Sequence, residues 1–243
     1  EDFLYKLFGV NAELLIDHAW GWEPTEIADC KAYTPESKSL SQGQVLSRPY
    51  SAKEGRIVVQ EMADQLSMDL VRKGLFTDQV VLDVSYDIEN LTDPKRAAKY
   101  KGAIVKDWYG REVPKGVHGS QNLGRQTNST KLIVKAVCDI YDRIVDNGLL
   151  VRRFNIAVTR LILQEDAKQA DSLPVQLDLF TDYEALEREK QAEEAELEKE
   201  RKMQKALIDI RDKFGKNAIV KGLNMQEGAT AIERNKQIGG HKA

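Results

Sequence analysis

The sequence predicts an α+β fold: a four-stranded βαββαβ sheet with two helices on one face, preceded by a short helical segment and followed by a long helix and a flexible tail. Three observations predict it. Two segments have the spacing of amphipathic helices, four have the features of strands, and their order is strand, helix, strand, strand, helix, strand. The 42% of hydrophobic residues is enough to build a core.

Residues 1–35 predict a separate helical module with a linker. Apolar residues between Phe3 and Ala19 recur at roughly helical spacing, and Gly21 with Pro24 ends the pattern. The residues that follow are acidic and lack periodicity, which is typical of a linker. The chain begins without Met and directly in an apolar helical pattern, which indicates an excised fragment.

Residues 36–165 carry the predicted sheet. A first strand runs to about Arg48, and Ser51 with Glu54 gives the capping-box pattern that opens a helix over residues 52–73. Apolar residues follow the i, i+3, i+4, i+7 rule along this helix. We therefore expect one of its faces to be buried against the sheet.

The remaining elements of the sheet follow this helix. Residues 80–87 alternate apolar and polar side chains, as in a strand with one covered and one wetter face. Residues 118–128 are polar but lie between clear elements, and we interpret them as the third strand. A helix capped by Asn128 or Ser129 then precedes the last strand, residues 150–163. The two helices cover one sheet face and leave the other open.

Three further segments follow the sheet. Residues 166–182 form a tether, and Pro174 within it disfavours a helix or a central strand. Residues 183–213 predict a charged, solvated helix of roughly 45 Å at 1.5 Å per residue. Residues 214–243 are poorly periodic, and we expect a tail that is flexible or ordered by a partner.

The net charge of −3 conceals a segregation of charge along the chain. Residues 37–164 hold twenty basic and fourteen acidic side chains, whereas residues 165–200 hold four basic and thirteen acidic ones. Such blocks are typical of separate modules. A basic middle domain permits binding of a polyanion through release of counterions, and the alternative is an ordinary solvated surface.

Small polar and basic side chains concentrate in the first and third predicted strands. Hydroxyl, amide and guanidinium groups hold a phosphate backbone without reading bases, so these strands predict a backbone-gripping open face; the alternative is an ordinary solvated sheet face. Basic residues of the last strand and of a helix start extend the same surface. The candidate contact residues are Lys38, Ser39, Ser41, Gln42, Ser47, Arg48, Ser120, Gln121, Arg125, Thr127, Asn128, Lys131, Arg152 and Arg153.

The long connection over residues 91–117 interleaves seven basic residues with Tyr100, Trp108 and Tyr109. This composition can contact nucleic acid. The alternative is a folded flap whose aromatic side chains pack on the domain.

No set of residues with catalytic or metal-binding spacing is apparent. Cys30 and Cys138 are far apart, and His18, His118 and His241 are scattered, so we expect neither a zinc site nor a disulfide. No convincing carboxylate pair, Ser/His/Asp set or phosphate loop is present. We expect no catalysis, metal or cofactor in this fragment. The absence of an apolar run of about 18 residues or of a signal peptide indicates a cytoplasmic protein.

The pentapeptide Gln176-Leu177-Asp178-Leu179-Phe180 is an apolar hook within the tether. Extended peptides of this kind place large apolar side chains in a partner's pocket, while a polar residue fixes the register. We therefore interpret it as a docking peptide. The alternative is that its apolar side chains pack back on their own domain.

Four motifs together resemble the C-terminal part of a bacterial Y-family, lesion-bypass DNA polymerase of the UmuC/DinB type. Residues 8–21 resemble the end of the thumb, and Lys38-Ser39-Leu40-Ser41 resembles the entry to the little finger domain. Residues 151–158 resemble the last strand of that domain, and the hook resembles the family's sliding-clamp-binding motif. The match covers most of residues 1–182.

The resemblance implies a function for each segment. Residues 1–35 would be a thumb remnant, 36–165 the DNA-gripping little finger, and 176–180 the site for the sliding clamp (beta clamp). The complete enzyme would add deoxynucleotides opposite damaged template bases during DNA repair and the SOS response, using Mg²⁺ at palm carboxylates that are absent from this sequence. It would be cytoplasmic and associated with the nucleoid when engaged.

Two other classes of function stay open on the sequence alone. The chain is alternatively a stand-alone nucleic-acid-binding regulator, or a protein-interaction scaffold that does not bind DNA. The basic character of residues 201–243, with ten basic and four acidic side chains, also motivates the hypothesis that the tail contacts a recombinase filament.

Overall fold

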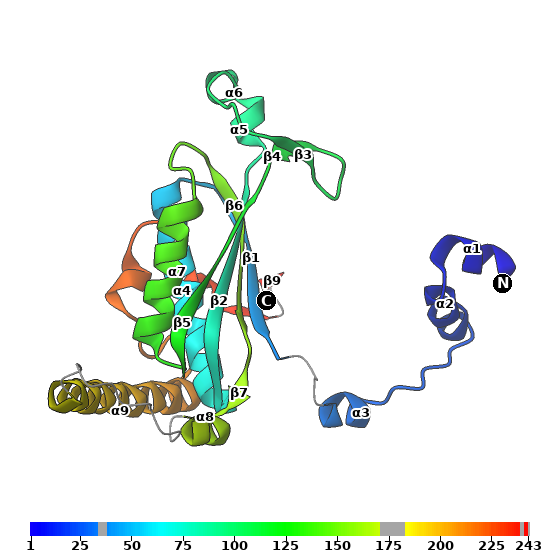
Figure 1. Cartoon of the computed structure of the whole chain (residues 1–243). Helices are drawn as coiled ribbons and strands as arrows, with labels where there is room; N and C mark the ends of the chain where they lie inside the picture. The colour runs from blue at the N-terminus through cyan, green and yellow to red at the C-terminus, as the bar shows by residue number, and fades with distance from the viewer. Residues whose placement is uncertain (34–37, 171–182, 239–240, 243) are drawn as a thin grey trace. The chain divides into compact units, whose positions relative to one another are not determined.

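The structure, a computed structural model, describes residues 1–33, 38–170, 183–238 and 241–242 (Figure 1). The chain divides into two compact units, residues 1–37 and 38–243. Within the first unit, Gly9 adopts a φ of 56° and separates the predicted helical segment into two helices. Ala12 is its only buried apolar residue in the described part. Its helices are α1 (Asp2–Phe8), α2 (Asn11–Ala19) and α3 (Ile27–Ala32).

The second unit is built on an antiparallel sheet with the strand order β1-β6-β2-β5. Helices α4 and α7 pack on one face of it, as the sequence predicts (Figure 1). The last predicted strand is shorter than expected, because Arg160 takes a positive φ of 54° and interrupts it. The short β7 that follows pairs with the start of β2. The elements are β1 (Leu40–Tyr50), α4 (Ala52–Lys73), β2 (Leu75–Tyr86), β5 (Val117–Thr127), α7 (Thr130–Ile144), β6 (Val151–Thr159) and β7 (Ile162–Leu163).

The caps of the two packed helices explain where they begin. Ser51 and Glu54 form both hydrogen bonds of the predicted capping box at the start of α4. Of the two candidate caps of α7, Ser129 is the one that accepts a hydrogen bond, from the backbone N–H of Leu132 at 3.2 Å. Each cap satisfies a backbone donor that the helix itself leaves unpaired.

The core lies between the sheet and these two helices. Val80, Leu82 and Val84 of β2 point into it at 0 to 1% exposure. Gly55 lets α4 approach the sheet closely, since a Cβ at this position would lie 2.8 Å from Val151 and 3.0 Å from Phe154. Side chains on alternate positions of the strands therefore define a covered face and, opposite it, an open face.

The connection between β2 and β5 is folded. Two single-turn helices lead into a hairpin, in which Val105 pairs with Val113. The elements of this insert are α5 (Glu89–Thr92), α6 (Pro94–Ala97), β3 (Ile104–Lys106) and β4 (Glu112–Pro114).

The C-terminal part differs from the predicted solvated helix and flexible tail. One face of the long helix α9 packs on the sheet domain, with Gln204 only 2% exposed. Glu61 of α4, 5% exposed, accepts hydrogen bonds from the backbone N–H groups of Thr230 and Ala231 at 2.7 and 3.0 Å. The described part of the tail is thus docked on α4 through these hydrogen bonds. The remaining elements are α8 (Gln164–Ala170), α9 (Tyr183–Phe214), a 3₁₀ turn (Gly222–Met225), α10 (Ala231–Arg234), β8 (Gln237–Ile238) and β9 (His241–Lys242).

Candidate nucleic-acid interface

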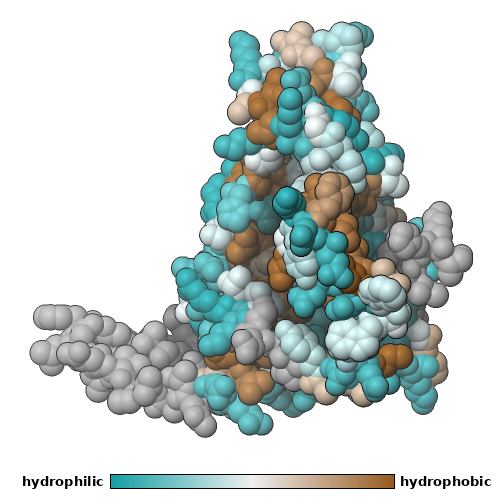
Figure 2. Space-filling view, turned by 90° about the vertical axis from the view of Figure 1, so that its right-hand side faces the viewer, coloured by the Kyte–Doolittle hydropathy of each residue, from teal (hydrophilic) through white to brown (hydrophobic). Residues whose placement is uncertain are grey.

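The open face is formed by alternate residues of the four long strands, whose register aligns them in rows. One row runs from Gly43 through Asn155 and Asp83 to His118. In Figure 2, which views the molecule from the side away from α4 and α7, hydrophilic and hydrophobic residues are interspersed. The neighbouring rows are Ser41, Ala157, Val81 and Ser120; Val45, Arg153 and Ser85; and Thr159, Gln79 and Asn122.

Cross-strand hydrogen bonds hold several of these polar side chains. Asp83 lies 2.5 Å from the Nδ1 atom of His118 and accepts a hydrogen bond from the amide of Asn155 at 3.4 Å. Thr159 donates to Gln79 at 2.8 Å, and the Gln79 amide donates to Asn122 at 3.1 Å. The open face is therefore a preformed network of polar groups across three strands, with one acidic side chain near its middle.

The structure brings only some of the candidate residues together on this face. Ser41, Ser120 and Arg153 belong to its rows. Ser47 is exposed further along β1, and Lys38 and Ser39 are exposed just before that strand begins. The side chain of Arg153 makes no hydrogen bond or ion pair with the described residues, so its guanidinium is available to a ligand.

Gln42 and Gln121 lie on the covered face, so the expectation that the polar residues of both strands share one face is wrong for them. Gln42 pairs in register with the buried Ile156, and its amide donates to Asp69 of α4 at 2.7 Å. Gln121 pairs with the buried Val80. Side chains alternate strictly along a strand, and adjacent candidates therefore point to opposite faces.

Two basic candidates lie near the end of the sheet at which β1 and β2 end, here called the hairpin end. Arg48 donates to Glu54 at 2.5 Å, and its guanidinium carbon lies 4.3 Å from the centre of the Tyr50 ring. The hydrogen bond from Arg48 lowers the pKa of Glu54 to about 2. Arg152 lies 3.7 Å from Asp87. Both arginines therefore already have acidic partners.

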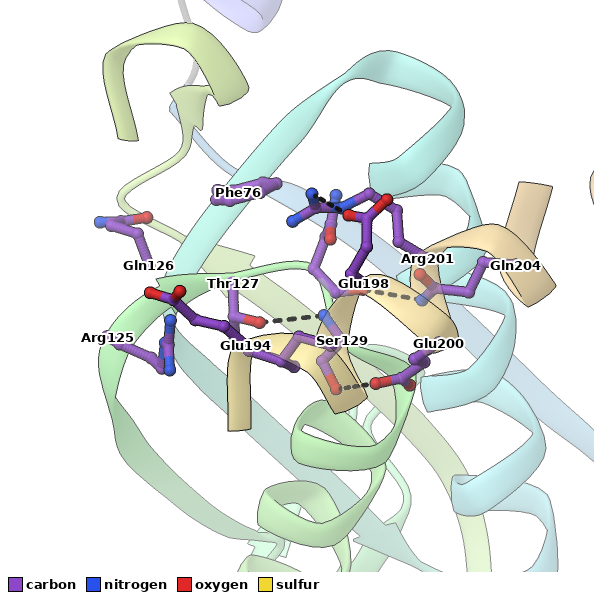
Figure 3. Close-up of a pocket in the computed structure, with 12 residues that line it drawn as sticks. Phe76, Arg125, Gln126, Thr127, Ser129, Glu194, Glu198, Glu200, Arg201 and Gln204 are labelled. Atoms are coloured by element: carbon purple, nitrogen blue, oxygen red, sulfur yellow. Dashed lines mark hydrogen bonds and ion pairs between the residues drawn. The ribbon is translucent and has the colours of Figure 1, made fainter. Parts of the chain in front are cut away.

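The remaining candidates lie at the opposite end of the sheet, here called the α9 end, next to α9 (Figure 3). Arg125 forms an ion pair with Glu193 at 3.0 Å, and Lys131 lies 3.5 Å from Glu196. Glu200 accepts hydrogen bonds from the Ser129 hydroxyl at 2.6 Å and from the Lys131 backbone N–H at 2.9 Å. A carboxylate of the chain itself thus occupies the start of α7, where an anion is favoured.

Thr127 and Asn128 are buried at the α9 end rather than available to a ligand. The Thr127 hydroxyl oxygen accepts a hydrogen bond from the Ser129 backbone N–H at 3.0 Å. The Asn128 carbonyl accepts one from the amide of Gln204 at 3.0 Å. These two candidates therefore belong to the region of the sheet domain on which α9 packs.

Most of the polar network of the open face was not predicted from the sequence, including Gln79, Asn155 and Thr159. The alternation of residues 80–87 was the available signal, since it identified one wetter face of the second strand. The roles of Glu200 and Gln204 were not predicted either, because their partners are more than 60 residues away in sequence.

The hook, Gln176 to Phe180, lies outside the described residues. Within the described ranges there is no cluster of three or more His, Cys, Asp or Glu suited to a metal ion. None of the helices described combines the length and the apolar character needed to cross a membrane.

Comparison with known proteins shows two related DNA polymerases. The chain is 24% identical over 242 residues to DNA polymerase IV 2 of Bacillus subtilis, which covers 99% of this chain and 47% of that protein. It is 23% identical over 239 residues to DNA polymerase IV 2 of Halalkalibacterium halodurans, with 96% and 46% covered. The chain thus spans about half the length of the curated relatives it matches.

A solved structure and a family profile also match. The little finger domain of PolIV, solved in complex with the beta-clamp processivity factor, is 12% identical, with a TM-score of 0.34 and coverage of 59% of this chain and 99% of that chain. A likeness of this size carries no conclusion about function. Residues 37–179, more than half of the chain, match the impB/mucB/samB family C-terminal domain. The chain therefore belongs to the impB/mucB/samB family, in agreement with its predicted resemblance to the C-terminal part of UmuC/DinB-like, Y-family polymerases.

Proposed function

We propose that this chain is the C-terminal part of a translesion DNA polymerase, and that the open face of its sheet grips the backbone of primer–template DNA. The observation that carries the proposal is the register of the open face. It gathers hydroxyl, amide and guanidinium groups from four strands, with Arg153 free of any described partner. Such groups contact phosphates and position a duplex without reading its sequence.

The dimensions of the open face support contact with a duplex. Four strands spaced about 4.8 Å apart span roughly 14 Å, which is close to the width of about 12 Å of the major groove of B-DNA. Asp83 lies in the middle of this surface and repels phosphate. Contacts are therefore expected along the rows on either side of the Asp83 row, where Ser41, Ser120 and Arg153 lie.

The polymerase reaction itself belongs to the parent protein in this proposal. The related polymerases are about twice as long as the region matched here. The carboxylates that hold the divalent metal would lie in the part of the parent that this chain does not span. The role of this chain is then to hold the duplex and to recruit the enzyme to sites of damage.

Recruitment is assigned to the hook. Leu177, Leu179 and Phe180 would enter an apolar pocket of the sliding clamp, and Gln176 would fix the register by hydrogen bonding. The triple variant Gln176→Ala, Leu179→Ala, Phe180→Ala should abolish clamp binding in a pull-down and leave duplex affinity unchanged. Clamp binding that survives in this variant would refute the assignment.

The DNA grip is tested by two matched substitutions in the full chain. Arg153→Gln removes an unpartnered charge of the open face, whereas Arg125→Gln removes a charge already paired with Glu193. Fluorescence anisotropy with a blunt duplex should show about three- to tenfold weaker binding for Arg153→Gln at low salt. Its salt slope should fall by about one, as expected for the loss of one phosphate contact.

The control variant distinguishes a specific contact of Arg153 from attraction by the total charge of the chain. Arg125→Gln should bind the duplex within about twofold of the unchanged chain. Equal losses in the two variants would indicate attraction by total charge alone, and no loss in either would exclude the open face as the DNA-binding surface.

A further inference from the structure

The insert between β2 and β5 ends in the β3–β4 hairpin, which lies beyond the sheet at the hairpin end. It projects to the side away from α4 and α7, which is the side of the open face (Figure 1). Residues of β4 contact both α5 and β2. The hairpin is therefore attached next to the surface that is proposed to bind the duplex. The proposed duplex binding gives the hairpin itself no role.

The turn of the hairpin presents two large aromatic side chains to solvent. Trp108 is 96% exposed and Tyr109 is 79% exposed. The alternative prediction, that the aromatic side chains of this connection pack on the domain, is therefore wrong for these two residues. Exposed aromatic surface of this extent on a folded hairpin indicates contact with a partner, because apolar area in water is unfavourable unless something covers it.

The turn is held by its own hydrogen bonds. Asp107 accepts hydrogen bonds from the backbone N–H groups of Tyr109 and Arg111, both at 2.9 Å, and from the Arg111 side chain at 2.8 Å. The Arg111 hydrogen bond also lowers the pKa of Asp107. Gly110 takes a φ of 77°, which a side chain would disfavour. The aromatic pair is thus displayed on a prefolded turn, so little ordering is needed when it binds.

The insert that carries this aromatic pair is rich in positive charge. The insert contains five lysines that form no ion pair with the described residues, and only Arg111 among its basic groups is engaged by a carboxylate. Unpaired cations in the same insert as exposed aromatic rings favour a polyanion with planar groups over an acidic or apolar peptide. The lysines are Lys95, Lys99, Lys101, Lys106 and Lys115.

We propose that the hairpin binds unpaired nucleotides, with bases stacking on Trp108 and Tyr109 and phosphates pairing with the lysines of the insert. This placement rests on the proposed function, because it sets the unpaired strand beside the duplex on the open face. Stacking of this kind does not depend on base identity, since every base has a π face. The hairpin would hold single-stranded nucleic acid next to a primer–template junction.

The chain permits a direct optical test. It has three Trp residues, and Trp20→Phe with Trp22→Phe leaves Trp108 as the only one. A single-stranded oligo-dT and a duplex with a single-stranded overhang should quench the fluorescence of Trp108, and a blunt duplex should quench it less. Fluorescence unchanged by either single-stranded probe would overturn the proposal.

Affinity gives a second test that also covers the aromatic pair. The variant Trp108→Ala, Tyr109→Ala should bind oligo-dT at least about thirtyfold more weakly, because each of the two stacked bases contributes about 1 kcal/mol or more. Trp108→Phe should retain most of the affinity, and Val105→Ala, a neighbouring exposed position, should retain all of it. Equal oligo-dT binding by the double variant and the unchanged chain would overturn the proposal.

The two proposals fail separately in these experiments. Arg153→Gln should weaken binding of a blunt duplex, whereas Trp108→Ala, Tyr109→Ala should leave it unchanged. If oligo-dT quenches the fluorescence of Trp108 but the chain does not bind a blunt duplex, the hairpin proposal stands and the open-face proposal is refuted. The opposite pattern would retain the duplex grip alone. Circular dichroism of each variant checks that the fold is kept.

Discussion

The two ends of the sheet carry similar polar and basic residues but present them differently. At the hairpin end, Arg48 and Arg152 have acidic partners, but the lysines of the insert and two aromatic rings face solvent without one. At the α9 end, Arg125 and Lys131 face carboxylates of α9. The comparison teaches that a basic stretch of sequence becomes a basic surface only if no distant acidic segment folds over it.

The periodicity of α9 explains the covered end. Glu193, Glu196 and Glu200 are three and four residues apart, so they share one face of the helix. This face meets Arg125, Lys131 and the start of α7. The opposite charge blocks of the sequence, basic in the middle and acidic after it, are in part neutralised within the molecule.

The largest expected effect is at Gln204, which fastens the α9 end. Gln204→Leu leaves the Asn128 carbonyl and the Thr130 hydroxyl without the donor they have at 3.0 and 2.9 Å. The free energy of unfolding in urea should fall by about 2 kcal/mol, because the buried Asn128 carbonyl loses this donor and the Thr130 hydroxyl keeps only its bond to Ser67. Met203→Leu, at an exposed neighbour, should change it by less than about 0.5 kcal/mol. Equal values for the two variants would mean that α9 is not fastened there.

A smaller effect is expected at Glu200, which distinguishes a helix cap from a simple ion pair. Glu200→Gln should cost about 1 kcal/mol of unfolding free energy, since the α7 start loses a carboxylate that accepts two hydrogen bonds. The matched Glu198→Gln removes only an exposed ion pair with Arg201 and should cost less than about 0.5 kcal/mol. Urea titrations of both variants make the comparison, and a larger loss at Glu198 would contradict it.

The smallest effect concerns Glu54 at the hairpin end and depends on pH. Its folded pKa of about 2 lies below the ordinary 4.5, so its stabilising contribution is present above pH 4.5 and is lost as the pH falls towards 2. Glu54→Gln should therefore be less stable by about 0.5 kcal/mol at pH 7, and the difference should shrink as the pH falls from 4.5 through 2. Arg48→Gln should reproduce part of this pH dependence. A difference that is constant from pH 7 to pH 2 would exclude the ion pair as its source.

Local patterns predicted the elements of the sheet domain well. Ser51 and Glu54 predicted the start of α4, and the alternation of residues 80–87 predicted both β2 and its wetter face. The faces of β1 and β5 were not predictable, because Ser41 and Gln42, or Ser120 and Gln121, are polar on both sides of the strand. Register against β6 and β2 decides which of each pair is exposed, and register depends on the whole sheet.

Contacts across long sequence separations were the part that local patterns cannot predict. Glu61 and Gln204 occur in ordinary amphipathic helices, and nothing near them in sequence identifies their partners. The pairing of Glu61 with Thr230 joins residues 169 positions apart. Such contacts form only where the fold brings the segments together, so a solvated helix and a flexible tail were reasonable predictions from composition alone.

The hydrogen bonds between the tail and Glu61 have a consequence for the order in which the parts of the protein fold during synthesis. Synthesis proceeds from the N-terminus at about 5 to 20 residues per second, so Thr230 leaves the ribosome roughly ten to thirty seconds after Glu61. During that interval the carboxylate keeps its water, and the outer surface of α4 stays bare. Docking of the C-terminal segment is then the last step of folding. A chain released before Thr230 is made would have a folded sheet domain whose α4 surface around Glu61 is uncovered.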